Sequence, residues 1–431
     1  MKCKRILAWL LLAAMLLTAP GYADGGGEST PAPTALAPTA PASDPGLPGA
    51  LPRVAEPQME SNEWMNDPSV KVDAAAVGVP DPPCRTAILV SLDTGEVLYE
   101  KEADAEVPMA SITKVMTLLL TLEAVEQGKI SMTDIVPISE HSYNMGGSQI
   151  WLEPGEQFTL DELIKAICVC SANDAAVAVA EFVGGSEPVF AEMMNQKAAE
   201  LGMTHSHFVN ACGLDAEGHY SSARDVAIMS RELLKHPKIL EYSSIWMDSL
   251  RGGATQMVNT NKLLKSYAGI TGLKTGTTNG AGVCISASAV RDGMGLLAVV
   301  LGSPSSAERF VAATELLDYG FANYELAPFP EVPGYTEILP VKGGVAETVG
   351  LTTSAPENLL LKKGTAKTLT AVLTLPESVE APVELGAQVG AVELKAGEET
   401  LGNYAVTAAG TVEEMDFDTA LSLLIKAVFT L

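Results

Sequence analysis

The chain has 431 residues, which is enough for two or three domains with a sizeable hydrophobic core. It carries 27 basic and 53 acidic residues, a formal net charge of −26, which argues against nucleic-acid binding and against electrostatic attraction to anionic lipid. The hydrophobic content of 47% and the charged content of 19% are those of an ordinary globular protein.

The amino-terminal residues have the pattern of a secretory signal peptide at 1–23. Basic residues within 2–5 precede an apolar run at 6–17, and small residues follow at 21 and 23. This order predicts cleavage after Ala23, because a charged start, a short apolar run and small residues define such peptides. A transmembrane anchor is the alternative, but the run is shorter than the ~20 residues that a spanning helix needs. We therefore expect an exported protein.

Composition divides the next part of the chain into three regions. Residues 24–80 are rich in Pro, Ala, Gly, Ser and Thr, which predicts a flexible linker without a core. Residues 81–326 show two strand patterns, a mostly helical middle, three more strand patterns and a final amphipathic helix. This order predicts an α/β (α+β) domain with a five-stranded antiparallel sheet, helices on it and a helical lobe. Residues 327–414 alternate short β-rich pieces with Gly and Pro, which predicts a small all-β, sandwich-like domain.

The last region, 415–431, predicts an amphipathic helix. Polar residues that recur every four positions form one narrow stripe beside a wide apolar face. These residues are Asp418, Ser422, Lys426 and Thr430. The apolar part is too short to span a bilayer, so we expect the helix to lie in the plane of the membrane surface as a candidate anchor. The alternatives are a helix packed on the β domain and an aggregation-prone tail.

Cysteine and histidine give no sign of a metal centre. Five cysteines follow the predicted cleavage site, and no two of them form a C-x-x-C pair. An odd number leaves at least one free thiol in an exported protein. The histidines show no metal-ligand spacing, so we predict neither a metal nor a cofactor.

One short stretch has the residues of an activated nucleophile. Ser111 and Lys114 form the only S-x-x-K of the chain, at the start of an apolar helical run at 112–122. Three residues apart on a helix, the two side chains lie on one face. A serine becomes a nucleophile when a base takes its proton, and a lysine is such a base when burial or another cation lowers its pKa. The pattern therefore predicts a second cation later in the chain.

Two further motifs are candidates for the same site. The motif Ser171-Ala172-Asn173 interrupts a helical pattern at 160–183, and the motif Lys274-Thr275-Gly276 lies in a predicted strand at 270–278. Each motif alone is weak, because each also fits a solvated helix face or a cap, and 142–144 is a second S-x-N. Their order and their contexts, a helix start, a helix junction and a strand, favour a single site.

Together the three motifs resemble those of penicillin-binding proteins and class A β-lactamases. Further stretches are similar to the low-molecular-weight D-alanyl-D-alanine carboxypeptidases, namely 147–148, 208–210, 219–225, 259–264 and 269–278. The resemblance covers roughly 87–323, and the β domain and tail resemble the carboxy-terminal half of the same family. It implies a β-lactamase/transpeptidase-like fold and a place at the outer face of the cytoplasmic membrane or in the cell wall.

The resemblance implies a serine-type carboxypeptidase that removes the terminal D-alanine from the pentapeptide stems of peptidoglycan. Ser111 would attack the scissile carbonyl, and Lys114 would accept the proton of Ser111. Lys274 would be the second cation, which keeps Lys114 neutral by like-charge repulsion and attracts the substrate carboxylate. Ser171 would relay a proton to the leaving D-alanine, and Asn173 would hold the substrate amide or Lys114.

The resemblance places the substrate along the strand that carries the K-T-G motif. Thr275 and Thr277 would hydrogen-bond the substrate carboxylate, and Gly276 would let the substrate lie along the strand edge. The backbone N–H groups of Ser111 and Thr277 would form the oxyanion hole. β-Lactam antibiotics would acylate Ser111 and stay bound, because no E-x-x-L-N stretch supplies the deacylating glutamate of a class A β-lactamase.

Three positions depart from the family pattern. Ala172 stands where glycine is frequent, Ala211-Cys212 where a proline–histidine pair is more usual, and Thr277 where an aromatic residue or histidine often follows K-T-G. These departures concern substrate preference and the role of the thiol rather than acyl transfer. The alternative functions are a β-lactamase, a DD-endopeptidase that cuts peptide cross-links, and a non-catalytic penicillin-binding scaffold.

Overall fold

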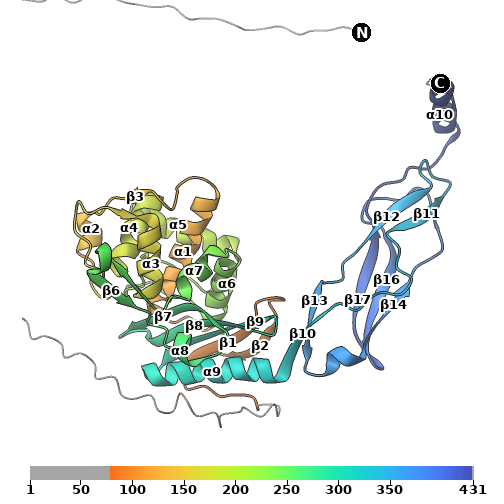
Figure 1. Ribbon diagram of the computed structural model, residues 1–431. Helices are drawn as coiled ribbons and strands as arrows, with labels where there is room; N and C mark the ends of the chain where they lie inside the picture. The colour runs from red at the N-terminus through yellow and green to blue at the C-terminus, as the bar shows by residue number, and fades with distance from the viewer. Residues whose placement is uncertain (1–77, 430–431) are drawn as a thin grey trace, which may run out of the picture. The chain divides into compact units, whose positions relative to one another are not determined.

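The computed structural model describes residues 78–429, and for 427–429 it describes only the backbone (Figure 1). The predicted signal peptide at 1–23 lies outside the described residues, as does the predicted linker at 24–80 up to residue 77.

A five-stranded antiparallel sheet forms the centre of the first folded region, with the strand order β2-β1-β9-β8-β7. The early strands β1 (Thr86–Ser91) and β2 (Val97–Lys101) join the late ones because β1 pairs with β9 (Met294–Ser303). From β9 the sheet continues through β8 (Gly282–Arg291) to β7 (Ile270–Thr278) at the edge. This confirms the predicted sheet of two early and three late strands.

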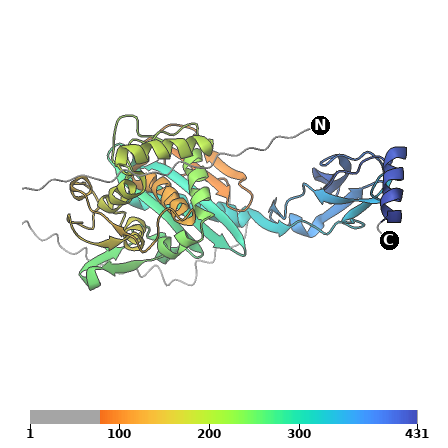
Figure 2. The ribbon, with the colours of Figure 1, turned by 90° about the horizontal axis from the view of Figure 1, so that it is seen from above.

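Helices cover both faces of the sheet (Figure 1 and Figure 2). On one face lies α9 (Ser306–Asn323), which packs with residues 296, 298 and 300 of β9 in one core. On the other face lie α1 (Lys114–Glu126) and α6 (Ala223–Leu234), and residues 297, 299 and 301 of β9 belong to their core. Successive strand residues point to opposite faces, so a strand covered on both sides is apolar throughout, as the sequence of β9 is.

The helical lobe lies on the α1 side of the sheet. Its helices are α2 (Glu140–Tyr143), α3 (Leu160–Val169), α4 (Asn173–Gly184), α5 (Glu187–Glu200) and α7 (Lys238–Ser243). Short α8 (Leu263–Ser266) belongs to the core on the α9 side. Two small two-stranded sheets flank the lobe: β3 (Ile135–Val136) with β4 (Phe158–Thr159), and β5 (Met247–Leu250) with β6 (Thr255–Val258).

The predicted break in the helical pattern at 160–183 is confirmed, since α3 and α4 are separated at 170–172. The start of α3 is defined by a capping box, in which the side chains of Thr159 and Glu162 each accept from the other's backbone N–H. Ser171 lies in the break with a φ of +62°. The chain therefore turns sharply between the two helices, at the S-x-N motif.

The later part of the chain is all-β, as predicted. A six-stranded sheet has the order β14-β16-β17-β12-β11-β15, and β10 pairs with β13. The strands are β10 (Tyr324–Pro328), β11 (Ile338–Lys342), β12 (Thr348–Thr353), β13 (Asn358–Lys362), β14 (Leu369–Thr374), β15 (Val379–Glu380), β16 (Gln388–Ala396) and β17 (Glu399–Ala408). Strand β10 crosses the domain boundary predicted between 326 and 327. The sequence did not lead us to expect β10, β12 or β15.

The tail forms α10 (Phe417–Phe429), which agrees with the predicted helix. Its apolar side chains are open to solvent, with exposed fractions of 79% for Phe417, 63% for Leu424 and 50% for Ile425. None of the helices in the described part of the chain has the length and hydrophobicity that crossing a membrane requires.

Candidate active site

The turn that carries Ser111 has an unusual backbone. Ser111 lies in a 3₁₀ helix, η2 (Ala110–Thr113), and the α-helix begins only at Lys114, two residues into the helical run that the sequence predicts at 112–122. Residues three apart are eclipsed in a 3₁₀ turn, so Ser111 and Lys114 still share one face. Ala110 has a φ of +51°, which is uncommon for a residue other than glycine.

Three hydrogen bonds hold the buried amine of Lys114. Nζ lies 2.9 Å from Ser111 Oγ, 2.6 Å from Asn173 Oδ1 and 2.6 Å from the backbone carbonyl oxygen of Cys212. The residue is 0% exposed. Burial lowers the pKa of Lys114 from 10.5 to about 8, because the charged amine loses its hydration. An amine with a lowered pKa at this distance can accept the proton of a serine hydroxyl.

The identity of these partners directs the lone pair of the amine. A carbonyl oxygen and an amide oxygen can only accept hydrogen bonds. The amide of Asn173 is oriented by its other end, since Nδ2 donates to the carbonyl of Gly146 at 2.6 Å. An uncharged amine has two N–H bonds and one lone pair. With the two N–H bonds used by Asn173 and Cys212, the lone pair is left for the hydroxyl of Ser111.

Lys274 supplies a second buried amine from β7. Its Nζ donates to Ser171 Oγ at 2.8 Å and to the carbonyl of Thr275 at 2.9 Å. Burial lowers the pKa of Lys274 well below its ordinary value, and the nearby charge of Lys114 lowers it further. From the resemblance we expected repulsion by Lys274 to keep the amine of Lys114 uncharged. In the structure burial is the principal cause for both amines. Repulsion by Lys114 lowers the pKa of Lys274 further, whereas the pKa of Lys114 is lowered by burial alone, which corrects the expected role of Lys274.

The strand β7 runs directly beside the turn of Ser111. A Cβ atom on Gly276 would lie 2.9 Å from the backbone nitrogen of Ser111, so glycine permits this approach. The hydroxyl of Thr275 donates to Thr260 Oγ1 at 2.6 Å, and the exposed Thr277 donates to the carbonyl of Gly276 at 2.8 Å. All eight residues predicted from the three motifs therefore lie in or beside one site.

Two regions of the chain match known families. Residues 73–305 match the family of the D-alanyl-D-alanine carboxypeptidases, and residues 334–414 match the C-terminal domain of penicillin-binding protein 5. The D-alanyl-D-alanine carboxypeptidase DacF of Bacillus subtilis (strain 168) is 42% identical over 341 residues, which are 78% of this chain and 88% of DacF. The chain belongs to the D-alanyl-D-alanine carboxypeptidase family.

Other relatives and solved structures agree with this assignment. The D-alanyl-D-alanine carboxypeptidase DacC of Escherichia coli (strain K12) is 33% identical over 79% of this carboxypeptidase and 87% of DacC. Penicillin-binding protein 5 of Haemophilus influenzae superposes with a TM-score of 0.71 at 30% identity, over 78% of this chain and all of that one (100%). Penicillin-binding protein D2 of Listeria monocytogenes, in its ampicillin-bound form, has a TM-score of 0.52 at 33% identity over 56% of this chain and 100% of its own.

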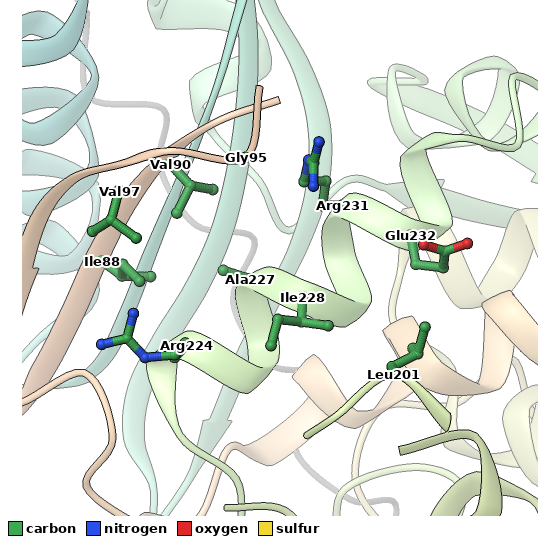
Figure 3. A pocket seen from close by; sticks show the side chains of 10 residues that line it. All are labelled: Ile88, Val90, Gly95, Val97, Leu201, Arg224, Ala227, Ile228, Arg231 and Glu232. Carbon is green, nitrogen blue, oxygen red and sulfur yellow. The ribbon is translucent and has the colours of Figure 1, made fainter. Parts of the chain in front are cut away.

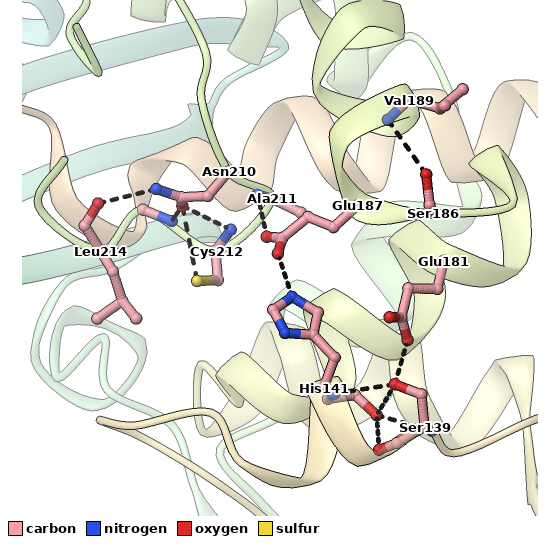
Figure 4. Close-up of polar contacts among 12 residues, drawn as sticks. Ser139, His141, Glu181, Ser186, Glu187, Val189, Asn210, Ala211, Cys212 and Leu214 are labelled. Carbon is pink, nitrogen blue, oxygen red and sulfur yellow. Dashed lines mark hydrogen bonds and ion pairs between the residues drawn. The ribbon is translucent and has the colours of Figure 1, made fainter. Parts of the chain in front are cut away.

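A polar network holds the loop of this carboxypeptidase that contains Cys212, whose carbonyl accepts from Lys114 (Figure 4). Glu187, at the start of α5, is buried and accepts the N–H of Ala211 at 2.9 Å. Its other oxygen lies 2.6 Å from Nε2 of His141. Asn210 Oδ1 accepts the N–H of Cys212 at 3.2 Å. The sequence reasoning missed this network, because a hydrogen bond to a backbone group leaves no motif.

A second support fixes the S-x-N motif to the preceding loop. The buried carboxylate of Asp174 accepts the N–H groups of Ile150 and Leu152, each at 3.1 Å. The N–H of Asn173 donates to the carbonyl of Ser148 at 2.6 Å. Asp174 follows the motif directly, so its presence in the sequence was the signal that could have identified this role.

The described part of the chain has further features outside the site. A pocket of about 320 Å³ lies between α6 and the β1–β2 hairpin and shares no lining residue with the site (Figure 3). One of its lining residues, Arg231, donates to the carbonyl of Leu92 at 3.0 Å.

All five cysteines within 78–429 are free thiols, and no group of three metal-ligating side chains occurs in that range.

Gly213→Ala is expected to displace Ala110, the residue that precedes Ser111 in the chain. Gly213 has a φ of +85°, and a Cβ there would collide with the carbonyl oxygen of Ala110. A misplacement of the reacting group by an ångström costs about 100-fold in rate, so labelling by fluorescent penicillin should slow by that order. Gly202→Ala is the control, because Gly202 has a φ of +74° but no atom lies within 4 Å of a Cβ placed there. Equal labelling rates for the two variants would contradict the prediction.

Proposed function

We propose that this carboxypeptidase removes the terminal D-alanine of peptidoglycan pentapeptide stems through an acyl-enzyme on Ser111. The observation that carries this proposal is the buried amine of Lys114, whose Nζ lies 2.9 Å from the hydroxyl oxygen of Ser111. The proton of Ser111 passes to Lys114, and Oγ bonds to the carbonyl carbon of the penultimate D-alanine. The C–N bond then breaks, and the terminal D-alanine leaves as a free amino acid.

The departing amine of D-alanine needs a proton. Ser171 is suited to relay it, because its hydroxyl is hydrogen-bonded to Lys274 and lies two residues from Asn173, which contacts Lys114. Water then attacks the acyl carbon, returns the proton through the same groups and frees Ser111.

Lys274 is the group proposed to bind the substrate carboxylate. Both of its hydrogen-bond partners are neutral oxygen atoms, and its pKa is lowered by burial. A carboxylate that enters the site would supply the missing opposite charge and favour the protonated amine. Thr275 and Thr277 flank the same position on β7, where Thr277 is exposed and could rotate toward the carboxylate.

The edge position of β7 suits a peptide that binds as an added strand. Gly276 leaves room beside the backbone nitrogen of Ser111, where the carbonyl of the substrate would lie. The N–H groups of Ser111 and Thr277 are the proposed oxyanion hole, which stabilises the negative charge of the tetrahedral intermediate.

We also propose that β-lactam antibiotics acylate the same serine and remain attached. The support comes from the ampicillin-bound penicillin-binding protein D2, which is 33% identical to this chain over the region it covers. A β-lactam carries an amide carbonyl and a carboxylate, the two groups for which Ser111 and Lys274 are arranged.

We further propose that the protein is exported and lies at the outer face of the cytoplasmic membrane or in the cell wall. The signal-peptide pattern at 1–23 supports export. The exposed apolar face of α10 supports a peripheral contact with the membrane surface.

Ser111→Ala is expected to abolish release of D-alanine from a pentapeptide and covalent labelling by fluorescent penicillin. Loss of the nucleophile should leave less than about one-thousandth of the wild-type rate. The control is Ser266→Ala, which alters an exposed serine on α8 and should keep both activities. Labelling of Ser111→Ala at the wild-type rate would remove Ser111 from this role.

The same assay separates the alternative functions. Rapid release of hydrolysed penicillin would favour a β-lactamase. Labelling of the wild-type chain without release of D-alanine would favour the endopeptidase or the non-catalytic scaffold.

The rate of acylation should follow the titration of Lys114. Its pKa in the folded protein is lowered to about 8, so the amine is mostly protonated below that pH and cannot accept a proton. The labelling rate should therefore rise by about tenfold per pH unit up to that pKa and become constant above it. Stopped-flow labelling across the range, with circular dichroism to check folding, gives the profile. A rate that is independent of pH from acid to alkaline solution would refute the base role.

Leu424→Glu is expected to weaken membrane binding. Leu424 is 63% exposed on the apolar face of α10, so a charge there should disturb the contact with lipid and leave the fold intact. Co-sedimentation with phosphatidylcholine vesicles should fall by about tenfold. Ser422→Glu adds the same charge to the polar stripe and should bind as the wild type does. Equal losses for the two variants would argue against an oriented helix at the membrane.

A further inference from the structure

His219 is a buried residue that the proposed reaction does not use. It is 4% exposed, and its ring packs edge-on against Phe208 with centroids 6.0 Å apart. Both ring nitrogens have partners. The backbone N–H of Val209 lies 3.0 Å from Nδ1, and Thr113 Oγ1 lies 2.7 Å from Nε2. Thr113 belongs to the S-x-x-K motif, so the histidine touches the segment that carries the nucleophile.

The partners of His219 determine where its proton lies. The N–H of Val209 can only donate, so Nδ1 must be the unprotonated nitrogen. Burial lowers the pKa of His219 from 6.5 to about 4, so the ring is neutral near pH 7 and carries one proton. That proton is on Nε2, which therefore donates to the hydroxyl of Thr113. The hydroxyl of Thr113 in turn donates to the carbonyl of Ala110 at 2.9 Å.

The carbonyl that receives this last hydrogen bond belongs to the most strained residue of the turn. Ala110 has a φ of +51°, a conformation that costs about 1–3 kcal/mol and persists only when its surroundings hold it. One constraint is Gly213, which approaches the carbonyl so closely that no Cβ fits between them. The other is the hydroxyl of Thr113. Ala110 directly precedes Ser111, so its conformation sets the direction of the serine side chain.

We propose that His219 is a positioning residue for the nucleophile. It fixes the hydroxyl of Thr113, which holds Ala110 in the left-handed conformation and keeps Ser111 on the amine of Lys114. The donors run in one direction, from Val209 through the ring of His219 and Thr113 to Ala110. His219 acts through Thr113, since neither of its nitrogens bonds to Ser111 or Lys114. The inference rests on the proposed role of Ser111 as the nucleophile.

Two pairs of variants separate positioning from simple packing. Thr113→Val keeps the shape of the side chain and removes the hydroxyl, whereas Thr113→Ser keeps the hydroxyl. His219→Leu fills the space without hydrogen bonds, whereas the amide of His219→Gln can accept from Val209 and donate to Thr113. A residue needed only for packing would tolerate Val and Leu at these positions better than Ser and Gln.

The measurements are the rates of acylation by fluorescent penicillin and of D-alanine release from a pentapeptide. Thr113→Val and His219→Leu should each lower kcat and acylation by about tenfold, with KM changed by less than about twofold. Thr113→Ser should retain the wild-type rate within about threefold, and His219→Gln should recover part of the loss of His219→Leu. The double variant Thr113→Val/His219→Leu should be no slower than either single variant, because both remove the same chain of hydrogen bonds.

Three results would overturn the inference. They are an unchanged acylation rate in Thr113→Val, losses that multiply in the double variant, and His219 protonated on Nδ1 in a ¹⁵N NMR spectrum of the wild-type chain. The spectrum and the variants Thr113→Ser and His219→Gln still decide the question if Val or Leu prevents folding, which thermal melting would reveal. A wild-type chain that is not labelled on Ser111 would instead count against the proposed function.

Discussion

A buried lysine amine that is hydrogen-bonded to three uncharged oxygen atoms governs the arrangement of this site. Transfer of a charged amine out of water is costly, so Lys114 is held in a state where losing its proton is easy. The fold surrounds the amine with two oxygens that can only accept and one hydroxyl that can also donate. The hydroxyl belongs to Ser111. The same burial that lowers the pKa of the base therefore also aims its lone pair at the nucleophile.

The groups that meet at Lys114 come from distant parts of the chain, so the site depends on the packing of the whole domain. Asn173 begins α4, Cys212 lies in the loop after α5, and β7 brings Gly276 to the backbone of Ser111. The loop of Cys212 is in turn fixed by the buried carboxylate of Glu187. Because the central sheet is covered on both faces, its edge strand β7 has a defined place beside the turn.

The sequence predicts the side chains of the site better than its backbone. Ser111, Lys114 and Lys274 could be found because three motifs, each weak alone, occur in an order and in structural contexts that favour a single site. The carbonyl of Cys212 and the strained Ala110 could not, because every residue has a carbonyl and a φ angle does not appear in the sequence. His219 was part of a recognised stretch, but its partner Thr113 lies 106 residues away in the chain.

The fold, too, has parts that could be predicted from the sequence and parts that could not. The five-stranded sheet could be predicted because the apolar run of β9 and the hairpin at 292–293 are strong local signals. Strand β12 could not, because threonine and glycine outnumber large apolar residues there, although Val349 and Leu351 alternate into the core. The cause of the low pKa of Lys114 was predicted wrongly as repulsion by Lys274, since a sequence does not show how completely an amine is shielded from water.

A direct titration of the Lys114 amine tests the central claim. Heteronuclear NMR of the intact chain with ¹⁵N-labelled lysine, with the signal assigned by its loss in Lys114→Met, gives the midpoint without any catalytic step. We expect a midpoint of about 8, as burial of the amine requires. A midpoint at the ordinary value of 10.5 would show that the amine is not the base that this structure describes.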